Sequence, residues 1–231
     1  MANLREFLNT HECDEELTNV LSQEIDVLLK KQPKFNLAIA GGNTPKNLYH
    51  KLSQVGLPWD KVQVTLTDER WVNNDHLDSN EKMVREVFFK NKALKASFIP
   101  LKNSISNAQE AVELCDKNLK QHMVKLDTVI LGMGEDGHFA SIFPNTVNLA
   151  ALLDLNQTHY CLAVLPKEKS DRMSLTLAYL LSAEKIYLRV SGLAKKKNLL
   201  DVLNGAALKD SYPVTALINQ QLCPIEIYWS P

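Results

Sequence analysis

Residues 35–48 read Phe-Asn-Leu-Ala-Ile-Ala-Gly-Gly-Asn-Thr-Pro-Lys-Asn-Leu and contain the transition that decides the fold. The short apolar run at residues 35–40 is typical of a buried strand. Two glycines follow, and Thr44 and Pro45 then occupy positions typical of a helix cap and of the first helical residue. A buried strand that turns directly into a helix is half of a βαβ unit, which indicates a parallel sheet.

The same alternation of short apolar runs and longer amphipathic segments continues along the chain. Further strands are predicted at residues 62–67, 128–131, 160–165, 186–190 and 225–229, and helices at residues 15–30, 108–123, 173–183 and 194–203. We therefore predict an α/β fold with an open, mostly parallel, Rossmann-like sheet, helices on both faces, and one domain spanning residues 1–231. Ligands bind such sheets at the carboxyl ends of the strands, so chemistry is expected in the loops that follow strands.

The bulk composition excludes several classes of protein. The chain has 231 residues, 45% of them hydrophobic, and 26 basic against 27 acidic residues give a net charge of −1. This composition argues against disorder and against nucleic-acid binding through bulk positive charge. We find neither a secretory signal pattern nor an apolar run of the roughly 18 residues that a membrane helix needs, so we predict a cytoplasmic protein without a membrane partner.

Cysteine spacing gives no sign of a metal site or a disulfide framework. The four cysteines, Cys13, Cys115, Cys161 and Cys223, are far apart and form no C-x-x-C pair. Cys161 lies in an apolar run, where we interpret it as a small buried hydrophobic residue.

Glycine is scarce, with 8 residues in the chain, and five of them lie in two clusters at residues 41–42 and 132–137. In the first cluster, the glycines let a ligand approach the backbone closely, and free N–H groups at a helix start favour an anion such as phosphate. The alternative interpretation is a tight turn with a capped helix and no ligand.

The second cluster reads Gly132-Met133-Gly134-Glu135-Asp136-Gly137-His138 and follows a predicted strand. Such a turn can expose backbone N–H groups to an oxyanion, and it brings Asp136 close to His138. A histidine oriented by a carboxylate can act as a general base near neutral pH. The other five histidines lack this setting, and we interpret them as surface or packing residues.

Charged residues follow three predicted strands on the expected ligand side. Asp68-Glu69-Arg70 comes after the strand at residues 62–67, and Arg172 and Lys195 precede or open predicted helices. Together the three cations could surround a phosphate. Surface ion pairing of residues 68–70 is the alternative, and the nearby Asp78 or Ser79 is predicted to cap a helix.

From about residue 40 to residue 195, the chain carries in order A-G-G-N-T-P, T-D-E-R-W-V, D-S-N, G-M-G-E-D-G-H-F-A-S-I-F-P, R-M-S-L-T and G-L-A-K. This series resembles the 6-phosphogluconolactonases. The resemblance implies hydrolysis of 6-phosphoglucono-1,5-lactone to 6-phosphogluconate in the oxidative pentose phosphate pathway. It also implies an open α/β fold shared with glucosamine-6-phosphate deaminases, no metal or organic cofactor, and a small-molecule sugar-phosphate lactone as the partner of a monomer or homodimer.

The resemblance also assigns roles to particular residues. His138 matches the family's catalytic histidine, with Asp136 in its motif, and Asp68 and Arg70 match an acidic-basic motif of the catalytic site. The residues expected to bind the sugar phosphate are Gly41, Gly42, Asn43, Thr44, Arg172 and Lys195.

Three alternative functions remain at this stage. The deaminases continue their histidine motif as G-H-I-A-F-N-E-P, and Phe143 stands here at the position of their glutamate. Their acidic motif tends to read D-E-Y where this chain has Arg70, so both differences favour the lactonase. A sugar-phosphate binding module without catalysis is the second alternative. A dinucleotide-dependent oxidoreductase is disfavoured, because Gly41-Gly42 lacks the G-x-x-G continuation.

Overall fold

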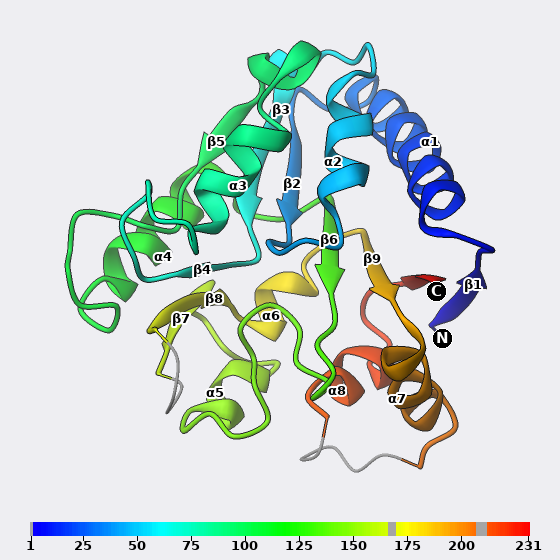
Figure 1. The fold of residues 1–231 in the computed structure, drawn as a ribbon. Coiled ribbons are helices and arrows are strands. Elements are labelled where there is room, and N and C mark those ends of the chain that lie inside the picture. The colour runs from blue at the N-terminus through cyan, green and yellow to red at the C-terminus, as the bar shows by residue number, and fades with distance from the viewer. Residues whose placement is uncertain (1, 166–169, 207–211) are drawn as a thin grey trace.

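The computed structural model describes residues 2–165, 170–206 and 212–231 (Figure 1). Its main sheet has seven strands in the order β1-β10-β9-β6-β2-β3-β5, and every neighbouring pair in it is parallel. These strands are β1 Asn3–Glu6, β2 Phe35–Ile39, β3 Val62–Leu66, β5 Ser97–Ile99, β6 Thr128–Gly132, β9 Lys185–Ser191 and β10 Ile225–Ser230. The predicted fold class is confirmed, and the edge strands β1 and β5 are additions to the predicted set.

A second, antiparallel sheet lies beside the carboxyl ends of the main strands, toward which the arrows of β2, β3 and β6 point in Figure 1. It contains β4 Asp68–Arg70, β7 Cys161–Val164 and β8 Arg172–Leu175 in the order β4-β8-β7. The strand predicted at residues 160–165 therefore exists as β7, but it belongs to this sheet and not to the parallel one.

The helix predicted at residues 173–183 is wrong in its first part. Residues 172–175 form β8, which pairs with β4 on one side and β7 on the other. The apolar residues there fit a helical period, but pairing on both edges favours the extended chain. The helix α6 starts only after Thr176, whose hydroxyl accepts a hydrogen bond from Tyr179 N.

The helices are α1 Thr10–Leu29, α2 Lys46–Ser53, α3 Asn80–Val87, α4 Val112–His122, α5 Leu149–Leu153, α6 Leu177–Leu180, α7 Leu193–Leu203 and α8 Val214–Asn219. The predicted helices at 15–30, 108–123 and 194–203 are confirmed as α1, α4 and α7. Within the described ranges, none of the helices is long and apolar enough to cross a membrane.

Two predicted caps have different outcomes. Ser79 caps α3 by accepting a hydrogen bond from Lys82 N, as predicted. The predicted Thr44 cap of α2 is wrong, because Pro45 occupies the cap position and no side chain makes a cap hydrogen bond. The start of α2 therefore keeps its N–H groups free of a side-chain cap.

The strand order reverses at β2, and this reversal indicates where a ligand would bind. From β2 the chain adds β3 and β5 on one side, and it then returns through α4 to β6 on the other side of β2. A crevice forms outside the carboxyl ends of the strands at such a reversal. The loops after β2 and β6, which contain the two glycine clusters, meet there.

Candidate active site

A cavity of about 230 Å³ lies at the carboxyl ends of β2 and β6. It brings together every predicted site residue except Asp136, which lies behind His138. The cavity is lined by Ala40, Gly41, Gly42, Asn43, Thr44, Pro45, Asp68, Arg70, Asn80, Gly132, Met133, Gly134, His138, Ala140, Arg172 and Lys195. Segments from five parts of the chain therefore contribute to one site.

The loop after β2 offers N–H groups to the cavity. Within the described chain, the N–H groups of Gly42, Asn43 and Thr44 have no hydrogen-bond acceptor. Gly42 adopts a left-handed conformation with φ +87°, which places successive N–H groups in an arrangement that suits an anion. The uncapped start of α2 and this loop together present hydrogen-bond donors to the cavity.

Asn80 is a cavity residue to which sequence reasoning assigned no role. Its side-chain amide donates to the Asp68 carbonyl at 2.9 Å and lies so close to Gly41 that a Cβ there would be 2.0 Å from Asn80 Oδ1. Gly41 is thus required by close approach of a neighbour. Asn80 thereby links the loop after β2 to β4.

The loop after β6 holds His138 by three contacts. His138 Nδ1 lies 2.5 Å from Asp136 Oδ1, and the His138 carbonyl accepts from Gly134 N at 2.8 Å. The imidazole packs against Phe143 with ring centroids 4.5 Å apart. Phe143 therefore supports the histidine at the position where the deaminases have a glutamate.

The carboxyl of Asp136 determines which nitrogen of His138 faces the substrate. Burial acts to raise the pKa of Asp136, but the hydrogen bond and charge of His138 outweigh it and leave that pKa lowered. An ionised carboxylate only accepts hydrogen bonds, so Nδ1 carries the proton. No described residue pairs with Nε2, which is therefore available to accept a proton in the cavity.

Replacing Gly134 by alanine should displace His138 and lower kcat by about 10²-fold, because small misplacements of a catalytic group cost about that much. A Cβ on Gly134 would lie 2.2 Å from both Cε1 and Nδ1 of His138. Steady-state kinetics with Gly56→Ala as the control measures this, since a Cβ on Gly56 meets only the flexible Lys92 Nζ at 3.4 Å. Equal kcat in both variants would contradict the described placement of His138.

Arg70 and Arg172 face each other across the antiparallel pair β4 and β8. Burial lowers the pKa of Arg172, although the nearby Asp68 opposes the shift. The Nε atoms of both arginines are buried and have no hydrogen-bond partner among the residues that the structure describes. Like charges directly opposite on neighbouring strands repel each other. This pair is therefore best satisfied by an anion or a polarised oxygen in the cavity.

Lys195 lies in the first turn of α7 and is the lysine of its run that lines the cavity. The next residue, Lys196, pairs with Glu6 at 2.7 Å and lies over the Trp229 ring, and Lys197 is exposed. Lys195 itself has no ion-pair partner in the described part of the chain. Its ammonium is therefore available to a ligand.

Asp68 and Glu69 are buried, so the alternative of a surface ion-pair cluster is wrong for these two residues. Asp68 accepts a hydrogen bond from Ser141 Oγ at 2.6 Å, which ties β4 to the loop that carries His138. Glu69 accepts from Arg70 N, Asn80 N and Glu81 N at 2.7–2.8 Å. Glu69 thus fixes the start of α3, a role that its sequence position did not reveal.

The stability of the fold should depend on the protonation of Glu69. Burial raises the pKa of Glu69 from 4.5 to about 7, although its three N–H donors oppose the shift. The folded protein binds the Glu69 proton more tightly than the unfolded chain does. The stabilisation of the fold by protonated Glu69 is therefore complete below the pKa of Glu69 in the unfolded chain, and it is lost as the pH rises through about 7.

We expect the free energy of unfolding of the wild type to fall by about 3 kcal/mol relative to Glu69→Gln between about pH 4.5 and pH 8. Urea denaturation across this range measures the difference, with exposed Glu110→Gln as the control. If the free energy of unfolding changed with pH in the same way in the wild type and in Glu69→Gln, the raised pKa of Glu69 would be contradicted.

The site offers little to a metal ion. In residues 2–165, 170–206 and 212–231, no three His, Cys, Asp or Glu side chains are grouped as metal ligands would be. The cavity is lined by an imidazole, cationic side chains, the Asp68 carboxyl group and backbone N–H groups.

Comparison with known proteins now places the chain in a family. It matches the family described as glucosamine-6-phosphate isomerases/6-phosphogluconolactonase over residues 9–229. It is 36% identical to a 6-phosphogluconolactonase from Pseudomonas aeruginosa over 88% of this chain and 84% of that protein. A 6-phosphogluconolactonase from Helicobacter pylori is 33% identical over 98% and 97% of the two chains.

A solved structure agrees with these relatives. The crystal structure of a 6-phosphogluconolactonase from Shewanella baltica matches with a TM-score of 0.96 and 30% identity, covering 100% of this chain and 98% of the other. The chain therefore belongs to the glucosamine-6-phosphate isomerase/6-phosphogluconolactonase family.

Proposed function

We propose that this protein hydrolyses 6-phospho-D-glucono-1,5-lactone to 6-phospho-D-gluconate, a reaction of the oxidative pentose phosphate pathway. The observation that carries the proposal is His138, held at Nδ1 by Asp136, in a cavity that also presents free N–H groups and three cations. A base and an anion site in one cavity suit a phosphorylated ester. The similarity to 6-phosphogluconolactonases over nearly the whole chain supports this choice of substrate.

The phosphate is assigned to the loop after β2 and to Lys195. The free N–H groups of Gly42, Asn43 and Thr44 match the acceptor oxygens of a phosphate, and the Lys195 ammonium supplies a positive charge at the same cavity. This binding fixes the sugar ring and directs its C1 carbonyl toward His138. Arg70 and Arg172 are left to face the carbonyl oxygen and ring hydroxyls.

Hydrolysis then proceeds as acyl transfer to water. His138 Nε2 takes a proton from a water molecule as the water oxygen attacks C1, and the carbonyl electrons move onto the oxygen. Arg70 or the N–H groups of the loop after β6 stabilise that oxyanion. When the tetrahedral intermediate collapses, the bond from C1 to the ring oxygen breaks and protonated His138 returns the proton to that oxygen. The imidazole ends unchanged, and Asp136 stabilises its charged form throughout.

Two parallel assays distinguish this function from its rivals. Purified protein with 6-phosphogluconolactone should release acid faster than a buffer blank, and with glucosamine 6-phosphate it should release no ammonia. Ammonia release without lactone hydrolysis would instead identify a deaminase. Binding of 6-phosphogluconate with neither reaction would identify a binding module.

Replacing Lys195 by alanine should raise KM for the lactone by about 10–100-fold with little change in kcat. A charge-assisted hydrogen bond contributes about 1.5–3 kcal/mol, and a contact to the phosphate acts equally on bound substrate and transition state. Steady-state kinetics measures this, with exposed Lys197→Ala as the matched control. An unchanged KM in Lys195→Ala would indicate that the phosphate binds to Arg70 and Arg172 and not to Lys195.

The wider setting is part of the same proposal. We assign residues 1–231 to one domain that acts in the cytoplasm, without a cofactor, as a monomer or homodimer. Size-exclusion chromatography with light scattering and activity measured after treatment with a chelator test these assignments.

A further inference from the structure

A buried polar network outside the cavity contains a carboxylate and a guanidinium that the proposed reaction does not use. Asp14 on α1 lies at its centre and is 0% exposed. Asp14 Oδ1 accepts from Arg189 Nε at 2.9 Å, and Asp14 Oδ2 accepts from Asn47 Nδ2 at 2.9 Å. Arg189, on β9, is 1% exposed. The network therefore joins α1, α2 and β9, which come from distant parts of the chain.

At one end, the network holds the start of α2, a helix that packs beside α1 (Figure 1). Asn47 is the second residue of α2 and closely follows Thr44 and Pro45, both of which line the cavity. Asn47 itself is not among the described residues that line the cavity. The contact from Asn47 to Asp14 therefore holds the N–H groups of residues 42–44 in place without touching a ligand.

At the other end, the network holds the start of α7. Arg189 Nη2 donates to Ser230 Oγ at 2.9 Å, and Ser230, on β10, is 0% exposed. The Ser230 carbonyl accepts from Gly192 N at 3.0 Å. Gly192 is the residue before α7, which carries Lys195 in its first turn. The same series of contacts thus reaches the helix whose lysine is assigned to the phosphate.

The ion pair at the centre of the network contributes direction more than net stability. Both charges lose their hydration on burial, so replacing such a pair by apolar residues is often neutral. All three nitrogen atoms of the Arg189 guanidinium donate, Nε to Asp14, Nη1 to the Val190 carbonyl and Nη2 to Ser230. A buried polar network whose members are satisfied fixes the relative positions of the segments that it joins.

We propose that the network of Asn47, Asp14, Arg189 and Ser230 positions the start of α2 against the start of α7, so that the loop N–H groups and the Lys195 ammonium meet one phosphate. This positioning role rests on the proposed function, which assigns the phosphate to these two elements. Loss of a network contact should therefore weaken binding of the phosphorylated ligand and leave the chemistry of the imidazole unchanged.

Replacing Asn47 by alanine tests the network without leaving a buried charge alone. Asp14 keeps Arg189 as its partner, and alanine is the better helix former, so α2 itself is not weakened. We expect KM for 6-phosphogluconolactone and Kd for 6-phosphogluconate to rise about tenfold, the effect of one hydrogen bond to a charged group, while kcat stays within about twofold. Steady-state kinetics and titration calorimetry measure these quantities.

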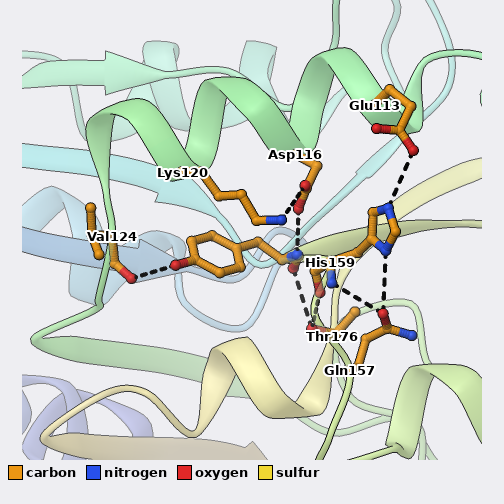
Figure 2. A network of polar contacts seen from close by, with 8 residues as sticks. Glu113, Asp116, Lys120, Val124, Gln157, His159 and Thr176 are labelled. Carbon is orange, nitrogen blue, oxygen red and sulfur yellow. Dashed lines mark hydrogen bonds and ion pairs between the residues drawn. The ribbon is translucent and has the colours of Figure 1, made fainter.

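A network of similar composition between α4 and β7 supplies the matched control (Figure 2). There the exposed Lys120 pairs with the buried Asp116 at 2.6 Å, and Asp116 also accepts from Tyr160 N at 2.6 Å. Within the described ranges, the residues that line the cavity include none of these three. Lys120→Ala removes an exposed donor from a buried carboxylate, as Asn47→Ala does, and should leave KM and Kd unchanged.

Ser230→Ala tests the other end of the network. It removes the acceptor of Arg189 Nη2 beside the start of α7, and we expect KM and Kd to rise while kcat is kept. If this variant fails to fold, Asn47→Ala decides the question alone, because the Asn47 side chain is exposed and its loss leaves the ion pair intact.

The positioning role is overturned if KM and Kd of Asn47→Ala stay within about twofold of the wild type, or if Lys120→Ala raises them equally. Failure of the proposed function gives a different result. A wild type that binds 6-phosphogluconate without hydrolysing the lactone would contradict the proposed function alone, and Kd of Asn47→Ala would still decide the positioning role. A wild type that binds no 6-phosphogluconate would overturn both.

Discussion

Replacing His138 by alanine should lower kcat for lactone hydrolysis by about 10²–10⁴-fold, the usual contribution of a general base. The substituted protein keeps the free N–H groups and the cations, so KM should change little. The expectation follows from the 2.5 Å contact between Nδ1 and Asp136 Oδ1, which leaves Nε2 as the nitrogen that accepts a proton from water. The lactone also opens unaided, so each rate is measured as the excess over a protein-free blank.

The matched control for this variant is His122→Ala. His122 is an exposed histidine at the end of α4 and does not line the cavity. Circular dichroism and Tm should show that both variants are folded. Full activity above the blank in His138→Ala would assign the base to another group.

Replacing Asp14 by alanine should reduce the free energy of unfolding by about 3–5 kcal/mol, the cost of leaving one charge of a buried ion pair alone. Arg189 and Asp14 have side-chain exposures of 1% and 0%, and Arg189 Nε lies 2.9 Å from Asp14 Oδ1. The pair joins α1 to β9, and Arg189 also donates to Ser230 Oγ on β10 at 2.9 Å. Without Asp14, the guanidinium remains in the core, and no other carboxylate in residues 2–165, 170–206 and 212–231 forms an ion pair with it.

Asp26→Ala provides the control on the same helix. Asp26 pairs with Lys30 at 2.6 Å, but both side chains are at least half exposed, and exposed ion pairs contribute about 0–1 kcal/mol. Urea denaturation should therefore show a much larger loss of unfolding free energy in Asp14→Ala than in Asp26→Ala. A similar small loss in both would show that water or a neighbouring group compensates Arg189.

The main sheet could be predicted because its central strands are buried apolar runs bounded by turns. The pattern at residues 35–39 and 62–66 needs no knowledge of the rest of the fold, since these strands are covered on both faces. The site loops could be predicted for a related reason. A chain that uses few glycines places them where close contacts demand them, as at Gly41 beside Asn80 and Gly134 beside His138.

Features that depend on distant partners were not predictable in this way. Residues 172–175 form a strand because β4 and β7 flank them, and β4 is remote from them in sequence. Glu69 is a buried acceptor only because the start of α3 folds back onto it. The sequence pattern carries local periodicity and turn chemistry, whereas these roles arise from packing between segments.

This cavity is expected to accelerate the opening of a phosphorylated lactone. The most direct measurement follows 6-phosphogluconolactone by phosphorus NMR with purified wild-type protein and in a protein-free blank. We predict loss of the lactone and matching appearance of 6-phosphogluconate at a rate proportional to protein concentration. A rate equal to that of the blank at every protein concentration would contradict it.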